Sequence, residues 1–166
     1  MLGTSNIANP YSYPHREGDE VTYRDVSKTV IQTIEDLEVE CLVCVGGDGT
    51  LSIAHRLAQE SVPIIGIPKT IDNDIHGTDI TFGFDTAVRI ATEGIDRLHT
   101  TAQSHHRAMI IEVMGRKAGW IALYAGAAGG GDIILIPEIS YDINRVADVV
   151  KDRYNRSKLW NMNYPD

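Results

Sequence analysis

Residues 41–50 read CLVCVGGDGT, an apolar run that ends in a glycine-rich turn. Residues 62–74, VPIIGIPKTIDND, follow the same plan, because a second apolar run ends in a polar segment rich in Asp. Continuous apolar runs of this length are typical of strands that are covered on both faces, as in parallel sheets. The two runs therefore predict neighbouring strands of a mostly parallel sheet, with polar residues at their carboxyl ends.

Segments with helical spacing alternate with apolar runs along the rest of the chain. Thr50 is expected near the N-cap of the second helix, and Asp85 or Thr86 at that of the third. This alternation predicts an α/β fold with a mostly parallel sheet flanked by helices. Residues 1–20 are expected to form an irregular lead-in. The expected helices are 26–37, 51–59, 86–98, 119–127 and 143–154, and the expected strands are 41–45, 62–67, 107–113 and 133–136.

Composition narrows the class of protein. The chain has 166 residues, 43% of them apolar, and a net charge of −8. This charge argues against nucleic acid or an anionic membrane as the main partner. No apolar run approaches the ~20 residues of a membrane span, and the N-terminus lacks signal-peptide features, so a cytoplasmic protein is expected. Cys41 and Cys44 are expected to be reduced core residues, since side chains three apart on a strand diverge.

The segment Gly46-Gly47-Asp48-Gly49-Thr50 suits a phosphate site. Glycines let the backbone approach a ligand, and the N-terminus of the following helix favours an anion. Asp48 would repel phosphate directly, so its presence indicates a magnesium ion between carboxylate and phosphate. A tight strand-to-helix turn also needs glycine, and that structural alternative stays open. No Walker sequence occurs, which disfavours the P-loop class.

The segment Thr70-Ile71-Asp72-Asn73-Asp74 follows the next strand. Residues two apart in an extended segment face the same side, so Thr70, Asp72 and Asp74 are expected to converge on one ligand. A carboxylate beside a substrate hydroxyl can take its proton as a phosphoryl group arrives. An Asx-rich turn is the structural alternative.

Two further strand ends are expected to join the same edge of the sheet. Met114-Gly115-Arg116 would supply backbone contacts and a guanidinium that neutralises developing charge. Glu138 would accept hydrogen bonds from sugar hydroxyls. A βα turn with a surface arginine, and a surface acid, are the respective alternatives. Arg107 lies at the opposite end of its expected strand and should not reach the same site. It is either a solvated arginine, which is the simpler interpretation, or a residue that serves a neighbouring subunit's site.

With these residues in view, the chain resembles the 6-phosphofructokinase family. The likeness runs in order through nearly the whole chain and is carried by five motifs. The sequence of residues 97–123 most resembles the bacterial group that mixes ATP- and pyrophosphate-dependent members. The motifs are GGDGT at 46–50, PKTIDND at 68–74, FGFDTA at 82–87, EVMGR at 112–116 and IPE at 136–138.

The resemblance implies transfer of a phosphoryl group to the C1 hydroxyl of fructose 6-phosphate in a Rossmann-like fold. It implies that Asp72 is the base, that Asp48 binds Mg²⁺ and that Arg116 stabilises the transition state. Arg107 matches an arginine that reaches a neighbouring subunit's substrate, which implies a homo-oligomer. The implied donor contacts are Gly46, Gly47, Asp48, Gly49, Thr50 and Lys69, and the implied sugar-phosphate contacts are Thr70, Asp74, Arg107, Met114, Gly115, Arg116 and Glu138.

The identity of the phosphoryl donor is predicted from two positions, 49 and 69. In this family a glycine at position 49 goes with ATP, whereas an aspartate there obstructs the nucleotide and goes with pyrophosphate. Lys69 is usual in pyrophosphate enzymes but also occurs in ATP users of the mixed group. A carboxylate obstructs by charge and volume, while a flexible lysine can move and is attracted to phosphate. ATP is therefore the expected donor, and pyrophosphate is the alternative.

The resemblance also implies an internal fragment, truncated at both ends. Residues 21–137 would form the donor-binding core, and residues 138–166 would begin the sugar-phosphate-binding portion. A lipid or NAD kinase is an alternative, because those enzymes also use a GGDG-type turn, but TIDND and MGR argue against it. A non-catalytic nucleotide- or sugar-phosphate-binding protein is the alternative of another class, and the presence of Asp72 and Arg116 argues against it.

Overall fold

The structure is a computed structural model that describes residues 8–115 and 117–162, with side chains described as far as residue 155. By its internal contacts the chain divides into two compact units, Met1–Lys69 and Thr70–Asp166. Each unit has its own secondary structure and its own packing, and each is described by itself.

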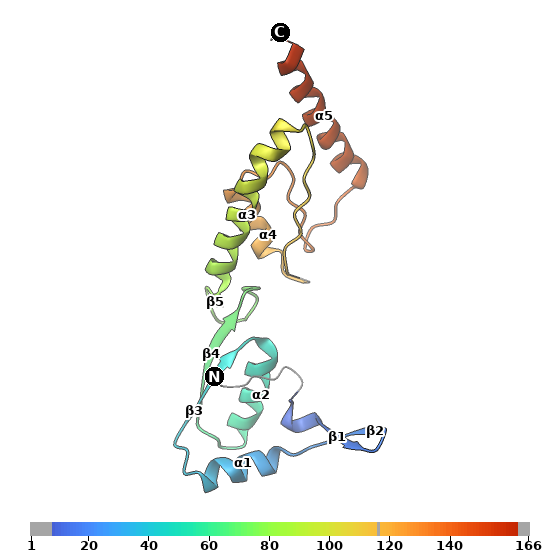
Figure 1. Ribbon diagram of the computed structural model, residues 1–166. Helices are drawn as coiled ribbons and strands as arrows, with labels where there is room; N and C mark the ends of the chain where they lie inside the picture. The colour runs from blue at the N-terminus through green and yellow to red at the C-terminus, as the bar shows by residue number, and fades with distance from the viewer. Residues whose placement is uncertain (1–7, 116, 163–166) are drawn as a thin grey trace. The chain divides into compact units, whose positions relative to one another are not determined.

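The first unit is built around two parallel strands (Figure 1). Strand β3 pairs with β4 in a register that begins with Leu42 opposite Ile64 and ends with Gly46 opposite Pro68. A two-residue strand of the second unit, β5 (Phe82–Gly83), follows in the strand order β3-β4-β5. The parallel pair and its helices confirm the α/β class that the apolar runs predicted. The elements are α1 (Ser27–Asp36), β3 (Leu42–Gly46), α2 (Asp48–Gln59) and β4 (Ile64–Thr70).

The two faces of this sheet differ in cover. Helix α2 packs on one face, where the Leu51 side chain lies against the Cα of Gly66. The other face carries Val43, Val45 and Ile65, which are 57%, 54% and 57% exposed. The expectation that both faces are covered is wrong for this unit, because its helices do not cover that side. Among the cysteines, Cys41 is exposed and Cys44 is half-buried, so neither is the buried core residue that was expected.

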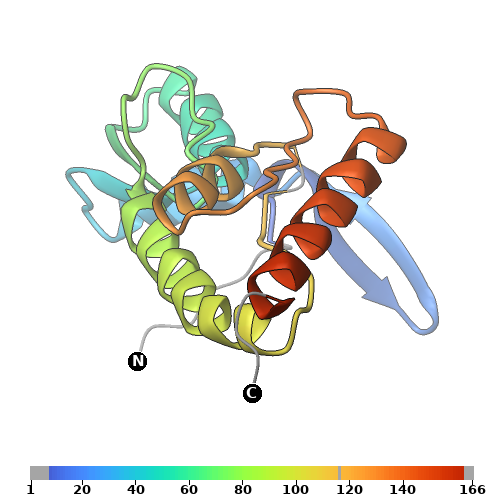
Figure 2. The same cartoon turned by 90° about the horizontal axis from the view of Figure 1, so that it is seen from above.

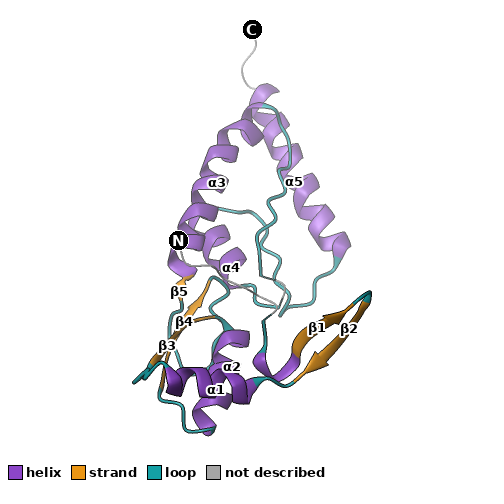
Figure 3. Ribbon diagram, turned by 60° about the horizontal axis from the view of Figure 1, so that its bottom comes forward, coloured by secondary structure: helices purple, strands orange, loops and turns teal. Residues whose placement is uncertain are grey.

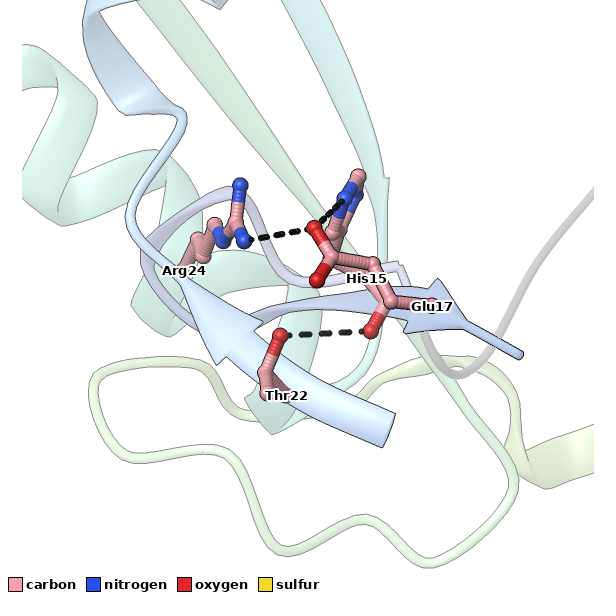
Figure 4. A network of polar contacts seen from close by, with 4 residues as sticks. All are labelled: His15, Glu17, Thr22 and Arg24. Atoms are coloured by element: carbon pink, nitrogen blue, oxygen red, sulfur yellow. Dashed lines mark hydrogen bonds and ion pairs between the residues drawn. The ribbon is translucent and has the colours of Figure 1, made fainter. Parts of the chain in front are cut away.

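A hairpin precedes the sheet, so the expected irregular lead-in is wrong for residues 10–20, while residues 1–7 of that expectation lie outside the described residues. After a short 3₁₀ turn η1 (Pro10–Ser12), strand β1 (Tyr13–Glu17) pairs antiparallel with β2 (Glu20–Arg24). Figure 4 shows two polar contacts that join its strands: the Arg24 guanidinium donates to the Glu17 carboxylate at 3.0 Å, and the Thr22 hydroxyl donates to the His15 carbonyl at 3.3 Å. Its residues are mostly polar and exposed, so no hydrophobic pattern marked these strands.

The second unit is mainly helical. Helix α3 packs against α4 (Figure 2), and the rings of Phe84 and Tyr124 meet edge to face with centroids 5.5 Å apart. Phe84, Ile121 and Ala125 are at most 5% exposed and form its core. An ion pair between Arg153 and Asp132 joins the middle of α5 to the segment after α4. The elements are β5 (Phe82–Gly83), α3 (Phe84–Ser104), α4 (Trp120–Ala128) and α5 (Ile143–Met162).

Two expected strands do not form. Residues 107–113 and 133–136 are drawn as loop in Figure 3 and carry no strand assignment. Ile110 is 95% exposed, so the apolar character of this run is not satisfied by burial. A strand needs a neighbouring strand that pairs with its backbone, and among the described residues no strand pairs with either segment. The helices were predicted in the right places, but α3 and α5 extend well beyond their expected ends.

Candidate active site

The glycine-rich segment joins β3 to α2 in the first unit. Gly47 is the N-cap and α2 begins at Asp48, so Thr50 lies inside the first turn and not near the cap as expected. Gly46 is buried, and a Cβ at this position would overlap the Thr50 side chain. Glycine at 46 is therefore required for the close approach of the strand end to the helix, which supports the structural role of this residue.

The N-terminus of α2 has the features of an anion site. No side chain caps this end, so the first N–H groups of the helix are open to a ligand. The Asp48 carboxylate is exposed in the first turn, and no hydrogen bond or ion pair engages it in the part of the chain that the structure describes. Nothing lies within 4 Å of a Cβ built at Gly49. Lys69 follows Pro68, which pairs with Gly46, and so lies at the same edge of the sheet.

The single carboxylate at Asp48 fits a Mg²⁺ ion that is bound together with a phosphate. Mg²⁺ in phosphoryl-transfer sites is commonly held by one or two carboxylates together with substrate phosphates and water. No group of three or more His, Cys, Asp or Glu side chains that suits a metal occurs among the described residues. An exposed single carboxylate beside a helix N-terminus therefore suits a metal that arrives with its phosphate, rather than a metal held by protein ligands alone.

The acidic segment begins the second unit and is fastened by Thr81. The Thr81 hydroxyl donates to the carbonyl of Thr70 at 2.8 Å, and the Thr81 N–H donates to the Asn73 side-chain oxygen at 2.9 Å. Asn73 has a φ of 53°, in the left-handed region. The Asp72 N–H donates to the Thr70 hydroxyl at 3.3 Å. From Ile71 the chain bends instead of continuing as the extended segment that was expected. The bond from the Asp72 N–H to the Thr70 hydroxyl is the pattern of an ST-turn, so the turn alternative fits locally, but with threonine and not Asp or Asn as the acceptor.

The two aspartates of this turn have different surroundings. Asp74 is exposed, whereas Asp72 is half-buried. Oδ1 of Asp72 is buried and has no hydrogen-bond partner within the described residues. A buried carboxylate oxygen without a partner is costly, on the order of 1–3 kcal/mol or more. Such an atom is the expected place for a ligand hydroxyl.

The segment at Met114 and Gly115 is shaped by its glycine. Gly115 has a φ of 137°, and a Cβ there would collide with the carbonyl oxygen of Ala118. Met114 is 73% exposed. Arg116 lies outside the described residues, so its predicted role stays a prediction. Because residues 107–113 form no strand, this segment does not follow a strand end as expected.

Glu138 is held at the N-terminus of α4. Its Oε1 accepts a hydrogen bond of 2.7 Å from the N–H of Gly119, which is the N-cap of that helix. The helix dipole favours a carboxylate in this position. Glu138 is therefore anchored by the helix, and residues 133–136 before it form no strand.

Arg107 follows the C-terminus of α3. Its N–H donates to the carbonyl of Ala102 at 2.9 Å, and with His106 in the left-handed region this bond closes a Schellman motif that ends the helix. Arg107 is exposed and lines a cavity of about 240 Å³ together with α5 residues that include Lys151 and Arg153. No hydrogen bond or ion pair among the described residues joins Arg107 or Glu138 to the Thr70–Asp74 turn.

The structure thus supports two separate local arrangements. In the first unit Gly46–Thr50 and Lys69 share one sheet edge, and in the second Thr70 and Asp72 are held in one turn. Sequence reasoning missed Thr81 and left Asn73 without a role. An asparagine between two aspartates is a signal for a left-handed turn residue, but nothing in the sequence pointed to its hydrogen-bond partner.

Comparison with known proteins agrees with the motifs. A family model described as Phosphofructokinase matches residues 3–162. The chain is 51% identical over 162 residues to the ATP-dependent 6-phosphofructokinase 3 of Bacteroides thetaiotaomicron, covering 98% of this chain and 47% of that protein. It is also 54% identical over 125 residues to a pyrophosphate–fructose 6-phosphate 1-phosphotransferase of Amycolatopsis mediterranei, covering 75% of this chain and 37% of that protein.

A solved structure shows the same fold. The crystal structure of a pyrophosphate-dependent phosphofructokinase from Marinobacter aquaeolei aligns with a TM-score of 0.71 at 27% identity, covering 80% of this chain and 38% of that one. The chain spans about half the length of the curated relatives it matches, or less. The likeness therefore covers most of this chain and the corresponding part of longer proteins.

Proposed function

This chain belongs to the phosphofructokinase family, and from that premise we propose that it carries the donor site and the catalytic base of a 6-phosphofructokinase. The reaction transfers the γ-phosphoryl group of ATP to the C1 hydroxyl of fructose 6-phosphate and gives fructose 1,6-bisphosphate, a step of glycolysis. The protein would act in the cytoplasm. No helix in the described part of the chain is long and apolar enough to cross a membrane.

The observation that carries this proposal is the buried, unpartnered Oδ1 of Asp72. In the proposed reaction the Asp72 carboxylate accepts the proton of the C1 hydroxyl. The C1 oxygen of the sugar then forms a bond to the γ-phosphorus of ATP. The bond between the γ-phosphorus and the oxygen that bridges it to the β-phosphorus breaks, and ADP leaves. Thr70, whose hydroxyl accepts from the Asp72 N–H, keeps its own O–H available to the substrate.

The first unit supplies the donor side. Backbone N–H groups at the start of α2, with Gly46, Gly47, Gly49 and Thr50, would surround the donor phosphates. Asp48 would hold Mg²⁺ together with the phosphate oxygens. Mg²⁺ offsets the negative charge of the phosphates when it is bound.

The remaining predicted residues complete the sugar-phosphate side. Asp74, Met114, Gly115 and Glu138 would contact fructose 6-phosphate, and Arg116 would stabilise charge in the transition state. Arg107 would serve the site of a neighbouring subunit, which requires a homo-oligomer. In this proposal residues 21–137 belong to the donor-binding core and residues 138–166 to the sugar-phosphate-binding portion.

A pyrophosphate-dependent reaction on the same sugar is the second candidate. Lys69 favours it, and so does the relative from Amycolatopsis mediterranei, whose name describes that reaction. The open space at Gly49 favours ATP, because a nucleotide donor needs that volume.

An assay of the full-length protein tests both candidates. Purified protein is supplied with Mg²⁺ and fructose 6-phosphate, and kcat/KM is compared with ATP and with pyrophosphate as donor. A clear preference for ATP is expected. A preference for pyrophosphate selects the second candidate, and turnover with neither donor contradicts the proposed function.

A further inference from the structure

Thr81 is the most buried polar side chain among the described residues of the second unit. It is 2% exposed, and both of its side-chain and backbone donors are directed at the acidic turn. Its carbonyl accepts the N–H of Phe84, the first residue of α3, at 3.3 Å. One residue therefore joins the start of the turn, the bend of the turn and the start of a helix.

The bend itself needs this partner. Asn73 has a φ of 53°, a conformation that costs free energy for any residue with a side chain, although asparagine tolerates it best. The hydrogen bond from the Thr81 N–H to the Asn73 side-chain oxygen stabilises this conformation. Because Asn73 has this left-handed conformation directly after Asp72, we expect the orientation of Asp72 to depend on this bond.

Among the described residues no hydrogen bond holds the Asp72 side chain. Its Oδ1 is buried without a partner in the described residues, and only its backbone N–H is engaged, by the Thr70 hydroxyl. The position of the carboxylate is therefore set by the backbone between Thr70 and Asn73. Thr81 holds both ends of that backbone segment.

We propose that Thr81 and Asn73 are positioning residues that hold the Asp72 carboxylate in the orientation required for proton abstraction. This inference rests on the proposed function, in which Asp72 is the base. A misplacement of about 1 Å at a reacting group can cost on the order of 100-fold in rate. Removal of either hydrogen bond should therefore act on kcat more than on substrate binding.

The test uses Thr81→Val in the full-length protein. Valine keeps the shape of threonine but removes the hydroxyl donor to the Thr70 carbonyl. The expected result is a decrease of kcat by about 10- to 100-fold with the KM values changed by less than about threefold. Thr81→Ser keeps the hydroxyl and should retain most of the rate. Asn73→Gly keeps the left-handed bend but loses the amide acceptor, and should lower kcat as Thr81→Val does.

Thr78→Val is the matched control. Thr78 lies in the same loop, and its hydroxyl donates to the carbonyl of Ile80 at 3.2 Å, away from the turn. It should leave kcat unchanged. Thermal unfolding of each variant separates loss of folding from loss of position.

A double-mutant cycle separates positioning from general destabilisation. In an Asp72→Asn background the base is already absent, so Thr81→Val should add no further decrease to the residual rate. An equal decrease in both backgrounds, or an unchanged kcat in Thr81→Val alone, would overturn the inference. These outcomes are distinct from failure of the proposed function, in which the unmodified protein would show no phosphoryl transfer.

Discussion

The Glu138 carboxylate lies 19 residues after Gly119 in sequence and accepts a hydrogen bond of 2.7 Å from its N–H. A Cβ at Gly119 would overlap Ile136 and lie 2.6 Å from Oε2 of Glu138. The absence of a side chain at position 119 is therefore what lets the carboxylate reach the helix N-terminus. This contact fixes Glu138, which is proposed to contact the sugar, to the N-terminus of helix α4 in the second unit.

Gly119→Ala should lower the stability of the protein because the new methyl group has no space. Overpacking of this kind costs about 1–3 kcal/mol. The free energy of unfolding, measured by urea denaturation, should fall by that amount. Gly94→Ala in α3 is the matched control, because nothing lies within 4 Å of a Cβ there and alanine favours the helix. Equal stability of the two variants would show that the Gly119–Glu138 contact is absent.

Gly49→Asp should lower the use of ATP without unfolding the protein. The space around position 49 is open, so the side chain is accommodated, but its charge would lie beside Asp48 at the proposed phosphate site. Like-charge repulsion of about 2–3 kcal/mol corresponds to a decrease on the order of 100-fold in kcat/KM for ATP. Steady-state kinetics with each donor measure this, with Gly49→Ala as the control for added volume. An unchanged kcat/KM for ATP in Gly49→Asp would remove position 49 from the donor site.

Tyr11 should make the stability of the protein depend on alkaline pH. Burial, with the hydrogen bond that its hydroxyl donates to Glu60 at 2.7 Å, raises the pKa of Tyr11 from 10.0 to about 12. Between these values the folded state keeps a proton that the unfolded state has lost, so the free energy of unfolding falls as pH rises. The Arg56 guanidinium lies 3.5 Å from the centre of the same ring.

Tyr11→Phe cannot lose this proton, so its stability should fall less steeply over the same window. Chemical denaturation at several pH values between 9 and 12 gives the slopes. Tyr23→Phe is the control, since Tyr23 is 68% exposed. Parallel slopes for the unmodified protein and Tyr11→Phe would show that the Tyr11–Glu60 bond does not persist in solution.

Some features of the fold follow directly from local sequence. The runs before Gly46 and before Lys69 are apolar and bounded by turn residues, and they form the parallel strands β3 and β4. The helices α1 and α2 were likewise predicted close to their observed bounds. Local signals suffice for these elements because each strand has a neighbour and each helix has an amphipathic pattern.

Other features depend on partners that a local pattern does not reveal. The apolar run around Ile110 reads as a strand but has no pairing partner in the described chain, and Ile110 stays 95% exposed. The hairpin β1–β2 forms through pairing of mostly polar residues, which no hydrophobic period marks. The bond from Thr81 to Asn73 spans eight residues, and its existence depends on the fold of the whole turn.

In the candidate site, too, the local sequence predicts the residue types but not their contacts with distant partners. The residue types at Asp48 and Asp72 were identified from motifs, and the structure adds that one is exposed and the other has a buried oxygen without a partner in the described part of the chain. Glu138 was interpreted as a sugar ligand alone, whereas its contact with Gly119 gives it a second, structural role. The roles of the site residues in catalysis stay predictions that kinetics must test.

The most direct test of the proposed chemistry is the turnover of Asp72→Asn in the full-length protein. Asparagine keeps the size of the side chain but cannot accept the hydroxyl proton, so kcat should fall by about 100-fold or more while the KM for fructose 6-phosphate stays within a few-fold. Asp79→Asn, an exposed residue of the same loop, should leave both values unchanged. A kcat for Asp72→Asn within a few-fold of the unmodified protein would contradict the assignment of Asp72 as the base.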